Sequence, residues 1–199
     1  MLVDLIRHGE PQGGSRYRGH GIDDPLSEQG WRQMWAAVGN ARPWDHVVSS
    51  PLRRCSAFAR ALADRHGLPL TIEPRFREVG FGDWEGRTRE ELKRERPDEY
   101  AAFYRDPARS RPAGAEPLDV FTARVAQAFE EMTGALDARH CLVVAHAGVI
   151  RAVVAHVLGL DDAGMYRLRI DNAGISRVSI TADRSVLLTF NSPLVPALD

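Results

Sequence analysis

The sequence predicts a three-layer α/β/α domain with a mainly parallel central sheet. Three short apolar runs, Leu2 to Ile6, His46 to Ser49 and Cys141 to Ala145, read as strands, and each is followed by a helical pattern. Strands that alternate with helices are typical of parallel sheets covered on both faces. The chain has 199 residues, of which 44% are hydrophobic and 27% charged, with no repeat, low-complexity tract or linker. We therefore expect one domain over residues 1–199.

In the first half of the chain, predicted strands alternate with predicted helices. After the strand from Leu2 to Ile6, residues 27–41 predict a helix with Ser27 as its N-cap, because Trp31, Met34, Trp35 and Val38 recur at helical spacing. That apolar stripe indicates core packing. Ser50 and Pro51 then read as the N-cap and first residue of a helix that reaches about His66. Residues 70–73 predict a third strand.

The second half carries a helical insertion before the pattern resumes. Residues 88–104 are strongly charged and helical with a break near Pro97, and the Pro- and Gly-containing segment 111–117 predicts a loop. We expect the insertion, about residues 87–117, to cover one face of the active site. The remaining expected elements are helices over 118–137 and 148–158, the strand from Cys141, and two or three strands around Leu168, Ser176 and Leu188.

Composition narrows the possible partners. The formal net charge of −1 and the pI of about 6.7 give no global basic field, which argues against nucleic acid and anionic membranes as partners. No leader-like or membrane-spanning segment is visible, and Cys55 and Cys141 form no CxxC pair. The expected protein is cytoplasmic, a monomer or homodimer, and binds a small molecule, with no metal and no cofactor.

Polar residues stand where three predicted strands end. They are Arg7-His8-Gly9 after the first strand, Ser49 to Arg54 after the second, and His146-Ala147-Gly148 after the CLVVA strand. Ligand sites of open α/β sheets form at the carboxyl ends of the strands, where helices present free N–H groups to anions. Guanidinium groups match phosphoryl oxygens in pairs, and a neutral imidazole is a competent nucleophile toward phosphorus. The sequence therefore predicts a phosphoryl-group site at this edge.

Four motifs in order carry a resemblance to the histidine phosphatase (phosphoglycerate mutase-like) superfamily. LIRHGE at 5–10 is similar to its RHG motif, SSPLRRC at 49–55 to its second arginine segment, EVGFGDWEG at 78–86 to its acid segment, and AHAGVIR at 145–151 to its second-histidine motif. The resemblance runs from about Leu2 to Thr189. The stretch YRGHGIDDPLSEQGWRQM and the short length most resemble the bacterial alpha-ribazole phosphatases.

The resemblance implies a phosphomonoester hydrolase that forms a phosphohistidine and needs no metal. His8 would attack phosphorus, and Glu78 would protonate the leaving alkoxide and then activate water. The expected catalytic residues are His8, Glu78, His146, Arg7 and Arg54, and the expected phosphate-binding residues are Arg7, Gly9, Gly19, Arg54, His146 and Ala147. Pro11 and Gly14 depart from the family pattern, so one expected substrate contact is missing.

Several alternatives stay open. Asp83 or Glu85 could replace Glu78 as the proton donor, with Glu78 only pairing an arginine. A cofactor-dependent phosphoglycerate mutase and a non-catalytic phospho-ligand or protein-interaction module remain possible functions. The spacing from Cys55 to Arg60 excludes a cysteine phosphatase, and His20 stands where a P-loop would need lysine. The histidines outside the motifs, His140 among them, are expected in loops or at caps.

The substrate expectation rests mainly on the resemblance. The loop over residues 13–21 and the insertion would line the mouth of the site. A mouth with both rings and cations suits a phosphorylated molecule with a flat ring, so the leading candidate is alpha-ribazole 5'-phosphate of cobalamin biosynthesis. The side chains expected at the mouth are Arg16, Tyr17, Arg18, Phe103, Tyr104, Arg105 and Arg109.

Overall fold

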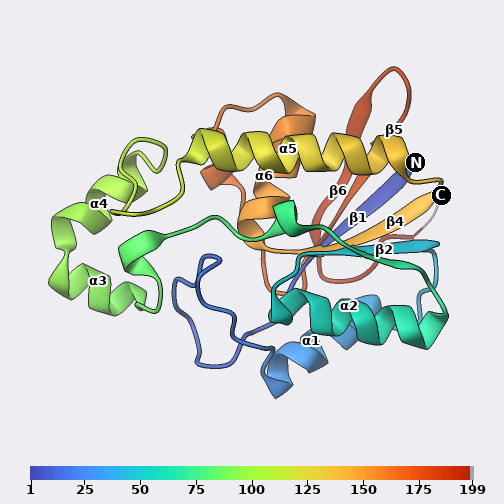
Figure 1. Cartoon of the computed structure of the whole chain (residues 1–199), viewed down its shortest axis with the longest axis horizontal. Coiled ribbons are helices and arrows are strands. Elements are labelled where there is room, and N and C mark those ends of the chain that lie inside the picture. The colour runs from blue at the N-terminus through green and yellow to red at the C-terminus, as the bar shows by residue number, and fades with distance from the viewer. Residues whose placement is uncertain (198–199) are drawn as a thin grey trace.

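A computed structural model describes residues 1–197, and its centre is one six-stranded sheet (Figure 1). The strand order is β3-β2-β4-β1-β5-β6. The first four strands in this order run parallel, and β5 and β6 are antiparallel to their neighbours. The strand bounds are β1 Leu2–Arg7, β2 His46–Ser49, β3 Leu70–Ile72, β4 His140–Ala145, β5 Ile175–Ile180 and β6 Ser185–Ser192. The mainly parallel three-layer prediction is confirmed.

Helices cover both faces of the sheet. In Figure 1, α5 and α6 lie on one face and α1 and α2 on the other, while α3 and α4 project beyond one end. Each face has its own buried hydrophobic cluster, one including residues of α5 and α6 and the other residues of α1 and α2. The helix bounds are α1 Glu28–Val38, α2 Arg53–His66, α3 Arg89–Glu95, α4 Pro97–Arg105, α5 Leu118–Ala135 and α6 Ala147–Leu158. Three 3₁₀ turns are η1 Pro74–Phe76, η2 Gly82–Trp84 and η3 Gly164–Arg167.

The register of the parallel strands places three chain exits at one edge. Arg7 at the end of β1 stands opposite Ala145 at the end of β4, and Ser49 of β2 stands opposite Val144. The residues that follow these strands therefore leave the sheet side by side. In Figure 1 this edge faces α3 and α4.

The helical insertion forms as the sequence predicts. Thr88 caps α3 through a reciprocal capping box with Glu91, and Pro97 is the first residue of α4, where its missing N–H costs nothing. The apolar side of the insertion packs around the fully buried ring of Trp84, which Leu92 and Phe103 contact in a third hydrophobic cluster. This cluster joins the insertion to the segment that precedes it.

Three local predictions are wrong. The helix α2 begins at Arg53 with Leu52 as N-cap, and the Ser50 hydroxyl bonds His146 as well as accepting from the Leu52 N–H. Leu168 lies after η3 and in no strand. His140 is the buried first residue of β4, held by the Asp4 carboxylate inside the core.

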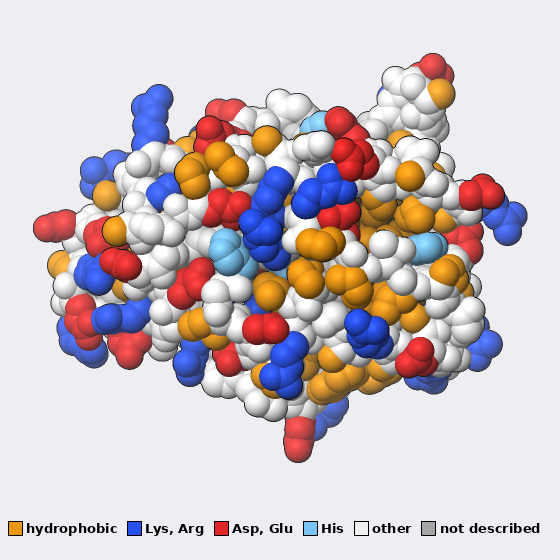
Figure 2. All heavy atoms as spheres, viewed as in Figure 1, with side chains coloured by type: hydrophobic (Ala, Val, Ile, Leu, Met, Phe, Trp, Pro, Cys, Tyr) orange, Lys and Arg blue, Asp and Glu red, His pale blue; other side chains and the backbone are white. Residues whose placement is uncertain are grey.

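The surface carries mixed charge. Cationic and anionic side chains are interspersed over the face drawn in Figure 2, in keeping with a net charge of −1. No helix within residues 1–197 combines the length and apolarity needed to cross a membrane.

Candidate active site

His8 follows β1 directly and faces a cavity at the edge of the sheet. Its Nδ1–H donates to the carbonyl of Gly9 at 2.7 Å, so the lone pair is on Nε2. Burial and the positive charges of Arg54 and Arg7 hold the pKa of His8 well below its usual value. The ring is therefore neutral near pH 7, which is the form that a nitrogen nucleophile requires.

His146 lies beside His8 at the end of the neighbouring strand β4. Its Nε2 is 2.7 Å from the Ser50 hydroxyl, and the Cys55 thiol packs against the same ring with its S–H donated to the carbonyl of Ala145. The ring is completely buried and is not among the side chains that line the cavity. Burial and the charge of Arg54 lower its pKa, so this imidazole is also neutral.

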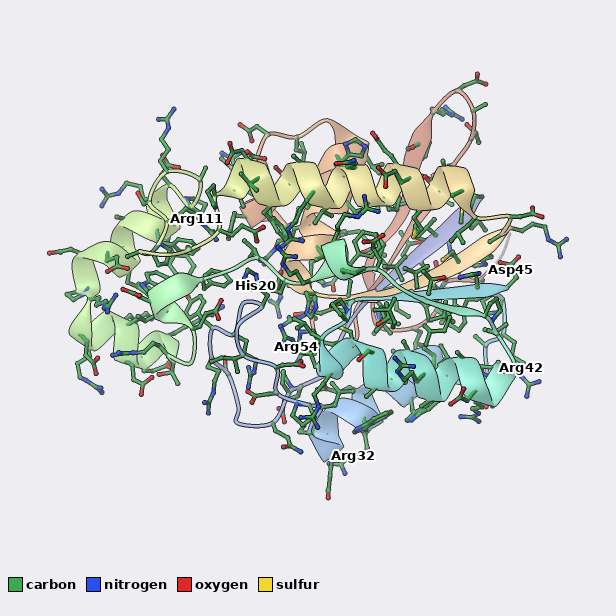
Figure 3. All side chains as sticks on the ribbon, viewed as in Figure 1. His20, Arg32, Arg42, Asp45, Arg54 and Arg111 are labelled. Atoms are coloured by element: carbon green, nitrogen blue, oxygen red, sulfur yellow. The ribbon has the colours of Figure 1, made fainter. Side chains whose placement is uncertain are left out.

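Two arginines flank the histidines. Arg7 lines the cavity and donates Nη1 to the carbonyl of Ile170 at 2.7 Å, while burial lowers its pKa to about 10, which leaves it cationic at neutral pH. Arg54, the second residue of α2, donates to the carbonyls of Ile22 at 2.9 Å and Gly19 at 2.7 Å (Figure 3). Its side chain thereby fixes the loop after β1 against the start of α2.

Of the three acidic candidates, Glu78 lines the cavity. Its carboxylate accepts the N–H of Val79 at 3.0 Å and that of Gly148, in the first turn of α6, at 3.2 Å. Glu85 instead accepts the N–H groups of Gly21 and Phe81 and so ties two loops together. Asp83 is exposed, 3.8 Å from Arg96, and neither it nor Glu85 lines the cavity.

Of the three small residues expected to bind phosphate, two line the cavity and one does not. Gly19 and Ala147 line the cavity, and Gly19 has a φ of +53° that favours glycine. Gly9 does not line it. A Cβ on Gly9 would lie 2.3 Å from the carbonyl oxygen of Gly30 in α1, so Gly9 permits close packing of the strand exit on that helix.

The loop after β1 is organised by a buried cation. Arg18 forms an ion pair with Asp24 at 2.8 Å and donates Nη2 to the carbonyls of Gln12 and Gly14. These contacts fix the backbone of the segment that carries Pro11 and Gly14, the two departures from the family pattern. The loop therefore forms one wall of the cavity without a polar side chain at position 14.

The cavity has a volume of about 390 Å³ and a cationic lining. Six arginines and two glutamates line it, and among residues 1–197 only Arg18 of these arginines has a carboxylate partner. The lining arginines are Arg7, Arg16, Arg18, Arg54, Arg89 and Arg151. Such a lining is suited to an anionic ligand.

The insertion contributes less to the mouth than expected. Arg16, Tyr17 and Arg18 line the cavity, but Phe103, Tyr104, Arg105 and Arg109 do not. Phe103 is buried against Trp84 because the apolar face of α4 is used for packing. Arg89 is the lining residue that the insertion supplies.

Other lining residues were missed by the sequence interpretation. Asn172 lies shortly before β5, whereas Glu10 and Arg151 stand within quoted motifs. Arg151 lies four residues after Ala147, which places both on one face of α6. That spacing could have identified it. Tyr166, which stacks near the Arg151 guanidinium at 5.7 Å, has no comparable signal in the sequence.

The chain is similar to known proteins in both sequence and overall structure. A family model described as the histidine phosphatase superfamily (branch 1) matches residues 3–193. An adenosylcobalamin/alpha-ribazole phosphatase of Salmonella typhimurium is 31% identical over 98% of each chain. A glucosyl-3-phosphoglycerate phosphatase of Mycolicibacterium vanbaalenii is 38% identical over 78% of this chain and 73% of its own. The crystal structure of the alpha-ribazole phosphatase from Shigella flexneri superposes over the full length of both chains with a TM-score of 0.86 and 28% identity.

Proposed function

The chain belongs to the histidine phosphatase superfamily and is a phosphatase, and from this premise we propose that it hydrolyses a small phosphomonoester through a phosphohistidine on His8. The observation that carries the proposal is the neutral His8 ring, whose Nδ1–H is fixed on Gly9 while cationic Arg7 and Arg54 flank it. A neutral nucleophile beside two cations is matched to an anionic phosphorus centre.

In the first step, His8 Nε2 attacks phosphorus and the bond to the ester oxygen breaks. Arg7 and Arg54 stabilise the charge that gathers on the non-bridging oxygens, while the buried His146 ring packs edge to face against His8 behind the cavity wall. Glu78 gives its proton to the departing alkoxide. Hydrogen bonds from the Val79 and Gly148 backbone keep the resulting carboxylate at the cavity wall.

In the second step, water attacks the phosphohistidine. The Glu78 carboxylate takes a proton from this water, an O–P bond forms, the N–P bond breaks, and inorganic phosphate leaves with His8 neutral again. The arginines supply the positive charge that a metal ion provides in other phosphatases. No step in this sequence calls for a metal or organic cofactor.

For the substrate we propose alpha-ribazole 5'-phosphate as the leading candidate. Relatives named alpha-ribazole phosphatases align over nearly the whole chain. Tyr17, Phe81 and Tyr166 in the cavity lining offer ring surface to a flat base. The support comes mainly from the relatives.

A second candidate is a phosphomonoester that carries a carboxylate, such as a phosphoglycerate derivative. The observation that favours it is the arginine excess in the cavity, since Arg16, Arg89 and Arg151 line it besides Arg7 and Arg54 and have no acidic partner within residues 1–197. A relative named glucosyl-3-phosphoglycerate phosphatase shares 38% identity. A carboxylate would match this surplus charge better than an uncharged base.

The deciding experiment compares kcat/KM for alpha-ribazole phosphate, glucosyl-3-phosphoglycerate, 3-phosphoglycerate, fructose bisphosphate and nucleoside monophosphates. We expect alpha-ribazole phosphate to lead. Preference for the carboxylated esters, reduced selectively by Arg89→Gln or Arg151→Gln, would select the second candidate. Efficient interconversion of 2- and 3-phosphoglycerate would identify a mutase, and inactivity on the whole panel would favour a binding module.

A further inference from the structure

The segment that carries Glu78 belongs to no regular element. Residues 77–81 lie between η1 and η2, so no helix or strand ladder fixes their backbone. Side chains from elsewhere must therefore set the position of Glu78. Those side chains are an ion pair, Arg124 with Glu116, together with His20.

Arg124 projects from α5 and has a bonding partner for each of its five N–H groups. Nε donates to Glu116 at 2.7 Å, and Nη2 donates to Glu116 at 2.9 Å and to the Glu78 carbonyl at 3.3 Å. Nη1 donates to the carbonyls of Arg77, at 3.0 Å, and Arg75. A single side chain thus holds three carbonyls of the segment that leads to Glu78.

Glu116 binds the same segment through the backbone of Gly80. Its carboxylate accepts the Gly80 N–H at 3.2 Å, and its own N–H donates to the Gly80 carbonyl at 3.1 Å. Burial opposes ionisation of Glu116, but the hydrogen bonds and charge of Arg124 outweigh it and lower the pKa of Glu116. The carboxylate is therefore charged at neutral pH and pairs fully with Arg124.

Two further side chains, His20 and Arg111, contact the backbone of residues 78–80 and connect it to residues near the mouth of the cavity. The His20 Nδ1–H donates to the Glu78 carbonyl at 3.1 Å, with the Glu116 carboxylate 4.0 Å away. Arg111 donates to the Gly80 carbonyl at 2.9 Å and to the hydroxyl of Tyr166, a cavity-lining residue, at 2.8 Å. Figure 3 places His20 on the loop after β1 and Arg111 beside the chain that leads into α5.

We propose that the buried Arg124–Glu116 pair is a positioning device that sets the Glu78 carboxyl for proton transfer to the leaving group. The proposal rests on the role proposed for Glu78 and adds residues that the four motifs do not contain. Both side chains are nearly buried, at 13% and 10% exposure. Their hydrogen bonds go to the backbone of residues 75–80 and to each other, and neither residue lines the cavity, so they act through Glu78 and not on substrate.

A purely structural role predicts something different. If the pair only stabilised the fold, its loss would reduce the amount of active enzyme, and the rates on all esters would fall together. If it positions Glu78, the loss is greater for esters whose leaving group needs protonation. The ratio of two rates on one sample is independent of the folded fraction and separates the two cases.

The experiment measures kcat/KM, which depends only on the steps up to loss of the leaving group, for glycerol 2-phosphate, with a poor leaving group, and for p-nitrophenyl phosphate, with a good one. The variants are Arg124→Gln, Arg124→Lys, Glu116→Gln and Glu78→Gln. Glu131→Gln is the matched control, because it removes an ion pair between η1 and α5, with Arg75 at 2.6 Å, that touches no atom of residues 77–81. Arg124→Lys also serves if Arg124→Gln fails to fold.

We expect Arg124→Gln to reduce kcat/KM on glycerol 2-phosphate by roughly 10- to 100-fold, as a small misplacement of a reacting group does, and on p-nitrophenyl phosphate by at most about threefold. Glu116→Gln should shift the ratio in the same direction, Arg124→Lys less, and Glu131→Gln not at all. Equal losses on both esters in the Arg124 and Glu116 variants, while Glu78→Gln shifts the ratio, would overturn the inference alone. A wild-type protein inactive on both esters would overturn the proposed function itself.

Discussion

The rings of His8 and His146 lie edge to face with their centroids 5.2 Å apart, at the ends of two neighbouring parallel strands. Each ring is buried, and each faces Arg54 and Arg7. A proton on either ring would place a third positive charge in the same small volume. Both rings are therefore neutral, which is the form that the attack proposed for His8 requires.

We predict that His8 is the nucleophile. On mixing with substrate and quenching, the wild-type protein should yield an acid-labile, alkali-stable phosphohistidine, because a phosphoryl group on nitrogen is lost in acid. His8→Ala should form none and lose at least the 10²–10⁴-fold typical of a removed catalytic group. Rapid-quench labelling with a ³²P-phosphate ester measures both.

His46→Gln is the control for that prediction. His46 bonds Thr71 through Nε2 at the far end of β2 and does not line the cavity. It should retain both labelling and turnover. Near-normal turnover in His8→Ala, or label on serine, would reassign the nucleophile.

The pH dependence should follow from the lowered pKa of His8. Burial, Arg54 and Arg7 move this pKa well below its ordinary value near 6.5, so the nucleophilic neutral ring persists as the pH falls through 6.5. The acid limb of kcat/KM, corrected for ionisation of the substrate, should lie clearly below pH 6.5. A limb centred at 6.5 or above would mean that the arginines and burial do not control this ring.

The sequence located most of this site because strand ends can be read from apolar runs. Parallel register then forces His8, Ser50 and His146 to one edge. The role of Ser50 could not be read in the same way, since a serine before a proline has the pattern of an N-cap whether or not its hydroxyl faces a buried histidine. That α4 turns its apolar face to Trp84 and not to the cavity depends on a contact between residues distant in sequence, Trp84 and Phe103.

The contacts that position the segment carrying Glu78 could not be predicted from the sequence either. Glu78 was found by its motif, but Arg124 and Glu116 contact it through backbone carbonyls and N–H groups, which leave no trace in residue type. An arginine on a helix reads equally as a solvated residue. Only the tertiary structure distinguishes the two.

Glu78→Gln should slow the hydrolysis of esters with a poor leaving group more than that of esters with a good one. The amide cannot give up a proton, so we expect a loss of roughly 10²–10⁴-fold on alkyl phosphates and a much smaller loss on p-nitrophenyl phosphate. Steady-state kcat/KM on the two esters measures this, because it does not include the later hydrolysis of the phosphohistidine. Glu85→Gln removes an acceptor that ties Gly21 to Phe81 and should not change the ratio of the two rates. A ratio that changes in Asp83→Asn or Glu85→Gln and stays constant in Glu78→Gln would move the acid role.

Chelation should leave activity intact. Within residues 1–197 no three His, Cys, Asp or Glu side chains gather in a way that could hold a metal ion, and arginines line the cavity instead. Dialysis against EDTA followed by assay on p-nitrophenyl phosphate tests the prediction. Complete loss of turnover that one added divalent metal restores would contradict it.

The buried Asp4 should make the free energy of unfolding depend on pH in the acid range. Its carboxylate accepts Arg177 Nε at 2.7 Å, Trp44 Nε1 at 2.9 Å and His140 Nε2 at 3.0 Å, deep in the sheet. Burial raises the pKa of Asp4, but these donors outweigh it, and the net pKa lies below the ordinary value. The stabilisation is therefore complete above the unfolded-state pKa, near 3.9, and is lost as the pH falls through the lower folded value.

Asp4→Asn should remove both the stabilisation and its pH dependence. At pH 7 the amide leaves the buried Arg177 without its counter-charge, which costs about 3–5 kcal/mol in the free energy of unfolding. As the pH falls below about 4, Asp4 takes up a proton in the unfolded wild-type chain before it does so in the folded one, so the wild type loses this stabilisation and the gap between the two proteins should narrow. Urea unfolding from pH 7 to pH 2.5 measures the gap, with the exposed Asp183→Asn as a control that should follow the wild type. A gap that stays constant across this range would show that Arg177 does not depend on the charge of Asp4.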